Sequence, residues 1–261
     1  MPLTSSPTIT GTLNEDINAS GSNYTANSFK NAFQGALILE VNGSEVHETS
    51  LINLEGITPF AEGGNRMCFV HPDNSKRCLK VIHPGLLKEI KKNKSWYKRF
   101  RSLESFDDNL REQEAYNQKA LKKDDPDMWT HLAKWHGMTE TNIGMASETE
   151  LITNNGEIAE TLETYLFREG ITEEIKLAIQ EFQTWLEKHL ILTKNLIPHN
   201  LVISQRNEKI IIKIIDGLGS QAFIPLPSYS SFFAKRYVKR RIQLMWSRIH
   251  WDLSGRKGNW K

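Results

Sequence analysis

The sequence is poor in cysteine and has no long apolar run. Cys68 and Cys78 are its two cysteines, too few for a disulfide framework, and the residues around them lack the spacing of a zinc site. No stretch approaches the roughly 18 consecutive apolar residues that a transmembrane helix requires. The start of the chain has neither the basic region nor the apolar stretch of a secretory signal. We therefore expect a cytoplasmic protein with reduced thiols.

The sequence also has little net charge, because two oppositely charged ends cancel. The formal net charge is +2 over 261 residues. Residues 1–60 hold one base against six acids, whereas residues 231–261 hold nine bases against one acid. The total charge therefore indicates no class of partner. Residues 1–50 are rich in Ser, Thr, Asn and Gly, and we interpret them as an acidic, polar N-terminal extension with a candidate β-hairpin at Asn42-Gly43.

The rest of the pattern runs from strands to helices, then to a hairpin and a last helix. Runs rich in β-branched and apolar residues, separated by turn residues, predict strands at 67–70, 77–82, 147–152, 201–204 and 209–215. Apolar residues at helical spacing predict helices at 105–121, 161–167, 172–189 and 229–251. This order indicates an α+β fold with two lobes.

Phosphoryl transfer needs a backbone cradle over the phosphates, a cation held by a carboxylate, metal ligands and a group that orients the nucleophile. Gly63 and Gly64, between two expected strands, are candidates for the cradle, although a glycine pair is also typical of a simple turn. Lys80 lies in an apolar strand and is the candidate cation. Glu112 is its expected partner on the following helix and Glu114 the alternative, and both could instead be surface charges.

Asn195, Asn200 and Asp216 form the most specific pattern. The run Asn195-Leu-Ile-Pro-His-Asn200 precedes the expected hairpin, and Asp216 follows that hairpin. This order brings an amide oxygen and a carboxylate to adjoining strand ends, which suits a hard cation such as Mg²⁺. An Asn-capped turn and an Asp-Gly turn would produce the same residues without a metal.

These runs resemble protein kinases and, more closely, the YrbL family of small kinase-like proteins named for the PhoP regulatory network. The resemblance covers about Leu51 to Trp251 and rests on EGGNRMCFVHPDNSKRCLKVI, WHGMTETNIG, ELITNNG with TLETYL, LTKNLIPHNLV and IIDGLGSQAFIPL. It implies a bilobal protein-kinase-like fold, with a small antiparallel-sheet N-lobe at 51–152 and a reduced helical C-lobe at 153–261 that ends in the basic helix.

The resemblance also implies ATP and Mg²⁺ as cofactors, bound between the lobes. Lys80 and Asn195 would be the catalytic residues. Thr149 would take the gatekeeper position, and the backbone of Glu150 and Ile152 would bind the adenine edge. The ATP-binding set is then Gly63, Gly64, Lys80, Glu112, Glu150 and Ile152, and the metal ligands are Asn200 and Asp216.

Three features depart from active protein kinases. Asn195 stands where those enzymes have an Asp, and an amide accepts no proton at neutral pH, so general-base catalysis is lost. No Phe follows Asp216, and only Gly217 to Lys261 come after it, too few residues for peptide-docking helices. We therefore predict an ATP/Mg-binding phosphotransferase with weak catalysis, whose acceptor is a small molecule or a non-peptide hydroxyl.

Two other functions remain open from the sequence. The chain could be a pseudokinase that acts as a regulatory binding protein through contact with a protein partner. Alternatively, the basic and aromatic C-terminal helix could bind an anionic membrane or nucleic-acid surface, without sequence-specific readout. A helix that caps the lobe and solvates its basic face would have the same composition.

Overall fold

A computed structural model describes residues 51–93, 106–123, 125–206, 209–220 and 226–260. The chain separates into two units, Met1–Glu48 and Thr49–Lys261, and every described residue belongs to the second. The expected N-terminal extension at 1–50, with its hairpin, lies outside the described residues, as do residues 94–105.

A five-stranded antiparallel sheet forms the smaller lobe. Its strands, in the spatial order β1-β2-β3-β5-β4, are β1 (Ala61–Glu62), β2 (Arg66–His71), β3 (Asn74–Ile82), β5 (Gly144–Glu150) and β4 (Trp135–Thr141). Because side chains alternate between the faces of a sheet, Phe69 and Leu79 point one way and Cys68 and Lys80 the other. The first face packs into a small apolar core with Val81 and Ala146. The second face carries the candidate site.

Helix α2 (Asp108–Tyr116) packs on this sheet, after the short helix α1 (Leu86–Asn93). Asp107 caps α2, because its side chain accepts hydrogen bonds from the backbone N–H groups of Asn109 and Leu110. The cap fixes where the helix starts and therefore which residues face the sheet. Asn109 and Glu112 are buried on that face.

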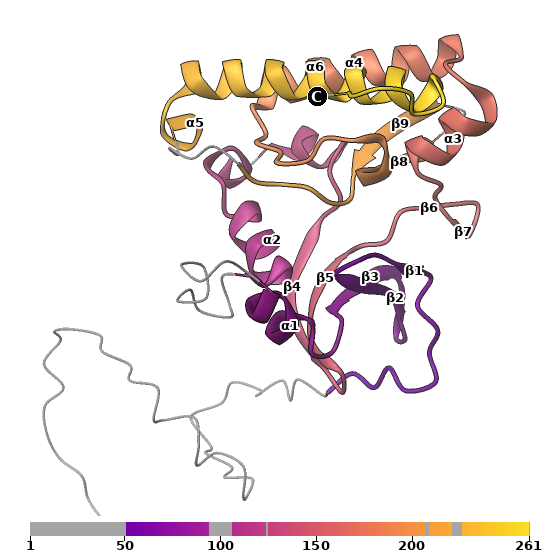
Figure 1. Cartoon of the computed structure of the whole chain (residues 1–261), viewed down its shortest axis with the longest axis vertical. Helices are drawn as coiled ribbons and strands as arrows, with labels where there is room; N and C mark the ends of the chain where they lie inside the picture. The colour runs from indigo at the N-terminus through magenta and orange to yellow at the C-terminus, as the bar shows by residue number, and fades with distance from the viewer. Residues whose placement is uncertain (1–50, 94–105, 124, 207–208, 221–225, 261) are drawn as a thin grey trace, which may run out of the picture. The chain divides into compact units, whose positions relative to one another are not determined.

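The larger lobe is built from helices and one hairpin around a second apolar core. Its main elements are α3 (Leu162–Glu169), α4 (Glu173–His189), β8 (Leu201–Arg206), β9 (Lys209–Ile214), α5 (Leu226–Tyr229) and α6 (Ser231–Leu253). Figure 1 shows α4 and α6 side by side above the β8–β9 hairpin, and the two helices are in contact. The shorter elements are η3 (Lys119–Lys122), η4 (Pro126–Trp129), β6 (Thr153–Asn154), β7 (Glu157–Ile158) and η5 (Pro198–Asn200).

The expected α+β fold with an antiparallel-sheet lobe and a helical lobe is confirmed, with differences in detail. Strand β4 was not predicted, because WHGMTET is polar and interrupted by a glycine. The helix expected at 105–121 ends at Tyr116 and is followed by η3. Met128 and Leu132, within the range assigned to the smaller lobe, pack in the core of the larger one. Among the described residues, none of the helices combines the length and apolarity needed to cross a membrane.

Candidate nucleotide site

Lys80 lies at the centre of the candidate site, on the face of β3 that points away from the small core. Its Nζ donates to Glu112 Oε1 at 2.6 Å and to the backbone oxygen of Ile215 at 2.6 Å. Burial acts to lower the pKa of Lys80, but the nearby anions, Glu112 first and then Asp216, together outweigh it and raise the pKa, so the lysine stays charged. Of the two glutamates that the sequence left open, the structure pairs Lys80 with Glu112, whereas Glu114 is exposed.

Arg66, a residue that the sequence reasoning missed, joins this pair to Asp216. It begins β2 directly after Gly63-Gly64-Asn65, and its side chain is only 11% exposed. One guanidinium nitrogen donates to Glu112 Oε2 at 2.8 Å and the other to Asp216 Oδ2 at 2.6 Å. The alternation of β2 could have placed Arg66 on the Lys80 face, but no known motif marked it.

Asp216 follows β9 and is held by two partners. Its Oδ2 accepts from Arg66, and its Oδ1 accepts from the backbone N–H of Gly217 at 2.6 Å. Partial burial acts to raise the pKa of the carboxyl, but the charges of Arg66 and Lys80 outweigh this and hold the pKa well below its ordinary value. Asp216 is therefore an anion at neutral pH, and its side chain is still 40% exposed.

The loop that carries Asn195 and Asn200 packs directly against the Asp216-Gly217 turn. Asn200 Nδ2 donates to the backbone oxygen of Asn195 at 2.8 Å, which leaves Oδ1 as the amide atom suited to a metal ion. Gly217 has a φ of +83°, and a Cβ there would lie 2.5 Å from the Asn195 oxygen. The glycine is therefore required by both conformation and space, whatever the site binds.

Gly63 and Gly64 are not required by the turn that they form. The turn is closed by a hydrogen bond from the Gly63 N–H to the Arg66 oxygen at 2.9 Å. A Cβ on Gly64 would meet nothing within 4 Å, and one on Gly63 would meet only that oxygen, at 3.8 Å. The protein alone thus gives no steric reason for either glycine, and their role as a phosphate cradle stays a prediction.

Glu150 and Ile152 follow Thr149, the residue of β5 that we expect at the gatekeeper position, and Thr149 is buried. The Glu150 N–H donates to Lys134, and the Ile152 oxygen accepts from Ala159. An adenine would therefore have to use the Glu150 carbonyl and the Ile152 N–H. The Glu150 carboxylate accepts from the buried Lys213 at 3.2 Å and so ties β9 to the end of β5, a contact that the sequence did not indicate.

Cys68 and Cys78 share the sheet face of Lys80. Cys68 lies directly opposite Lys80 in the β2–β3 register, and Cys78 lies two residues before Lys80 on β3. A hydrogen bond with Cys78 lowers the pKa of the Cys68 thiol to about 7, with Lys80 and Arg66 adding to the effect against burial. The pKa of Cys78 is raised by the same hydrogen bond and by burial. Cys68 is therefore the more reactive thiol.

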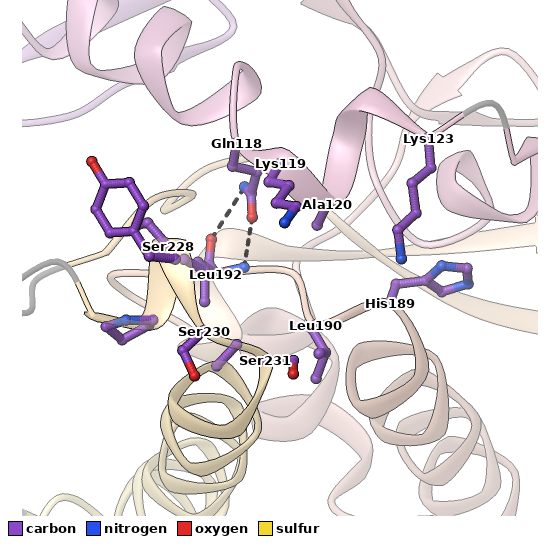
Figure 2. A pocket seen from close by; sticks show the side chains of 13 residues that line it. Gln118, Lys119, Ala120, Lys123, His189, Leu190, Leu192, Ser228, Ser230 and Ser231 are labelled. Atoms are coloured by element: carbon purple, nitrogen blue, oxygen red, sulfur yellow. Dashed lines mark hydrogen bonds between the residues drawn. The ribbon is translucent and has the colours of Figure 1, made fainter.

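A separate cavity of about 180 Å³ lies in the larger lobe, between η3, the end of α4 and the start of α6. Figure 2 shows Gln118 on one wall, hydrogen-bonded through its side chain to both backbone groups of Leu192, with Lys119 and Lys123 nearby. None of the predicted site residues lines this cavity. It therefore plays no part in the site around Lys80.

The geometry defines a class of protein. A lysine in the third strand pairs with a glutamate on the helix that packs on the sheet, above a loop with two asparagines and a later Asp-Gly turn. This is the arrangement of the protein-kinase-like fold. The sequence resemblance places Asn195 at the position of the catalytic Asp, and that assignment stays a prediction, so the arrangement fits a kinase or a pseudokinase.

The chain belongs to the YrbL family. The family model described as PhoP regulatory network protein YrbL matches residues 52–250. The chain is 24% identical over 208 residues to the YrbL proteins of Escherichia coli (strain K12) and Shigella flexneri, and the match covers 76% of this chain and 86% of theirs. The family resemblance expected from the sequence is confirmed.

Solved kinase structures are also similar to this chain. The structure of Rad53 1–466 in complex with AMP-PNP matches at a TM-score of 0.44 and 14% identity, over 76% of this chain and 47% of that one. The PknI kinase domain of Mycobacterium tuberculosis matches at a TM-score of 0.43 and 14% identity, over 75% of this chain and 73% of that one.

Proposed function

We propose that this chain binds ATP between its lobes and transfers the γ-phosphoryl group to a hydroxyl of a small or non-peptide acceptor. The observation that carries the proposal is the buried Lys80–Glu112 pair, which holds an ammonium group close enough to Asp216 to feel its charge. A buried, charged lysine with a carboxylate partner is what a kinase-like site uses to bind the α- and β-phosphates.

The residues predicted to contact the phosphates and the acceptor each have a role in this proposal. Lys80 binds the phosphates and Glu112 keeps the lysine in place. Gly63 and Gly64 let backbone N–H groups approach the phosphates. Asn195, exposed next to the Asp216-Gly217 turn, orients the acceptor hydroxyl without taking its proton, so the reaction is slow and the proton leaves to solvent.

Mg²⁺ fits the oxygen atoms that the site offers once Asp216 is released from Arg66. Asn200 Oδ1 and the Asp216 carboxylate are hard ligands, and Mg²⁺ typically binds one or two protein oxygens together with substrate phosphates. Among the described residues no group of three or more His, Cys, Asp or Glu side chains could hold a metal ion, so substrate phosphates would complete the coordination. When bound, the metal would neutralise charge on the transferred phosphoryl group.

The test is nucleotide binding and ATP consumption by the purified full chain. We expect Mg-ATP to raise the melting temperature of the wild type, and Lys80→Met to lower ATP turnover by roughly two orders of magnitude. Lys76→Met is the matched control, because Lys76 is an exposed lysine of the same strand. Turnover that is unchanged in Lys80→Met, with the fold intact by circular dichroism, would contradict the proposal.

A pseudokinase is the second candidate, and two observations favour it. Asn195 cannot act as a base, and Arg66 occupies an oxygen of Asp216 that a metal would need. A protein of this kind would bind nucleotide and signal through contact with another protein. A thermal shift with Mg-ATP without turnover on any hydroxyl acceptor would favour it over the enzyme.

Contact of α6 with an anionic surface is a separate proposal. Four exposed bases lie on this helix near exposed Phe232, namely Lys235, Arg236, Lys239 and Arg240. Arg241, in contrast, packs over the Tyr237 ring at 4.9 Å and donates to its hydroxyl. Binding to phosphatidylserine vesicles that survives Lys239→Glu with Arg240→Glu would contradict this contact.

A further inference from the structure

Arg66 joins Glu112, on the smaller-lobe side of the candidate site, to Asp216, on the larger-lobe side. A bound nucleotide with its metal would need Asp216 free of this ion pair. Its side chain spans from β2 of the smaller lobe to Asp216 of the larger lobe, and Asn109 Oδ1 accepts a further bond from it at 3.2 Å. Both nitrogens of the guanidinium end are thus used by carboxylates of the site.

The charges of the site are balanced through Arg66. Glu112 divides its two oxygens between Lys80 and Arg66, while Asp216 divides its own between Arg66 and the Gly217 N–H. Two cations therefore face two anions. A divalent cation on Asp216 would meet the guanidinium at 2.6 Å from the same oxygen, and like charges at such a distance repel strongly.

A nucleoside polyphosphate changes this balance. Its phosphates are better partners for a guanidinium than a single carboxylate oxygen is, because they offer several acceptor oxygens and more negative charge. Arg66 ends the Gly63-Gly64 turn. This is the turn that we expect to lie over the phosphates. Movement of Arg66 to the phosphates would release Asp216.

We propose that Arg66 is a latch: without nucleotide it holds Asp216 in an ion pair that excludes the divalent cation, and with nucleotide it binds the phosphates and releases Asp216 to the metal. This inference rests on the proposed nucleotide site and adds to it an order of events. Phosphates and metal then favour the same displacement, so that each strengthens the binding of the other.

If Arg66 is such a latch, one substitution of Arg66 should change the affinity for the metal and the affinity for the nucleotide in opposite directions. Mn²⁺ alone is the metal probe, followed by the electron paramagnetic resonance signal of the free ion, and ATP in EDTA is the nucleotide probe, followed by calorimetry. We expect Arg66→Met to bind Mn²⁺ about tenfold more tightly than the wild type and ATP about tenfold more weakly. General damage to the fold would weaken both.

Three further variants assign the effect. Arg66→Met with Asp216→Asn should lose the gain in Mn²⁺ affinity, since the released carboxylate is gone. Arg66→Lys, which keeps the charge but has no fork of donors, should lie between the wild type and Arg66→Met and serves if Arg66→Met does not fold. Arg206→Met, at the exposed end of β8, is the matched control and should change neither affinity.

Two results would overturn the latch. One is an Mn²⁺ affinity that is the same in the wild type and in Arg66→Met. The other is a gain that persists after Asp216→Asn, because the metal would then bind elsewhere. If neither ATP nor Mg-ATP binds the wild type, the proposed function fails, and the Mn²⁺ measurements still decide whether Arg66 keeps metal off Asp216.

Discussion

At the scale of single residues, the thiol of Cys68 reports on the candidate site. It lies opposite Lys80 in the β2–β3 register and is partly exposed, whereas Cys78 is buried. Only the thiolate is nucleophilic, so its reactivity follows its pKa. The pKa of Cys68 is lowered to about 7 by the hydrogen bond with Cys78, which makes this position sensitive both to pH and to whatever covers the sheet face.

We predict that iodoacetamide alkylates Cys68 first, with a rate that rises through about pH 7 because the thiolate forms above that pH. Mass spectrometry of the labelled protein measures the rate at each pH, and Cys68→Ser is the control. Bound nucleotide should slow labelling, since it would cover the face that Cys68 shares with Lys80. Faster labelling of Cys78, or a midpoint above pH 8.5, would contradict this prediction.

At the scale of elements, α2 determines which carboxylate reaches Lys80. The Asp107 cap sets the start of the helix, and the helical period then turns Asn109 and Glu112 toward the sheet and Glu114 toward solvent. Glu112 is 5% exposed and holds two cations, Lys80 and Arg66. The two glutamates are two residues apart but have opposite environments.

Glu112→Gln should therefore destabilise the fold, on the order of 3 kcal/mol, because it leaves two buried cations with one less carboxylate. Glu114→Gln should change the free energy of unfolding by less than about 0.5 kcal/mol, as is usual at the surface. Urea denaturation followed by circular dichroism measures both. Equal effects of the two substitutions would show that the helix does not present Glu112 to Lys80.

At the scale of the whole described unit, the core of the larger lobe contains a buried histidine. His131 packs against Phe182 and Trp185, and its Nδ1 lies 2.7 Å from the Ile212 oxygen. Burial lowers the pKa of His131 below its ordinary value of 6.5. Its ring is therefore neutral at pH 7, and protonation of the ring is less favourable in the folded chain than in the unfolded chain.

The stability of the protein should consequently fall as the pH drops through 6.5. In that range the unfolded chain takes up a proton at His131 more readily than the folded chain does, so protonation favours unfolding. Melting temperatures between pH 7.5 and 5 measure the slope. His131→Gln should reduce it, with the same change at exposed His250 as the control, and an unchanged slope in His131→Gln would refute the assignment.

Helix α4 shows what the local spacing of apolar residues can predict and what it cannot. Its apolar spacing predicted the helix at 172–189, and the structure has it at Glu173–His189 with Ile175, Ile179 and Phe182 buried. Leu177 is equally apolar but is 59% exposed, because two residues on from Ile175 a helix faces the other way. Periodicity thus determined the element, and packing decided its face.

The sequence by itself determined the elements of the site, since Lys80 in an apolar strand and the order Asn195, Asn200, Asp216 are local patterns. The tertiary structure alone decided that Glu112 rather than Glu114 pairs with Lys80, and that Arg66 bridges to Asp216. These contacts depend on strand register, on where α2 starts and on how the two lobes pack. An ion pair between residues 150 positions apart produces no periodic pattern in the sequence, because the fold of the intervening chain, and not local spacing, brings the two charges together.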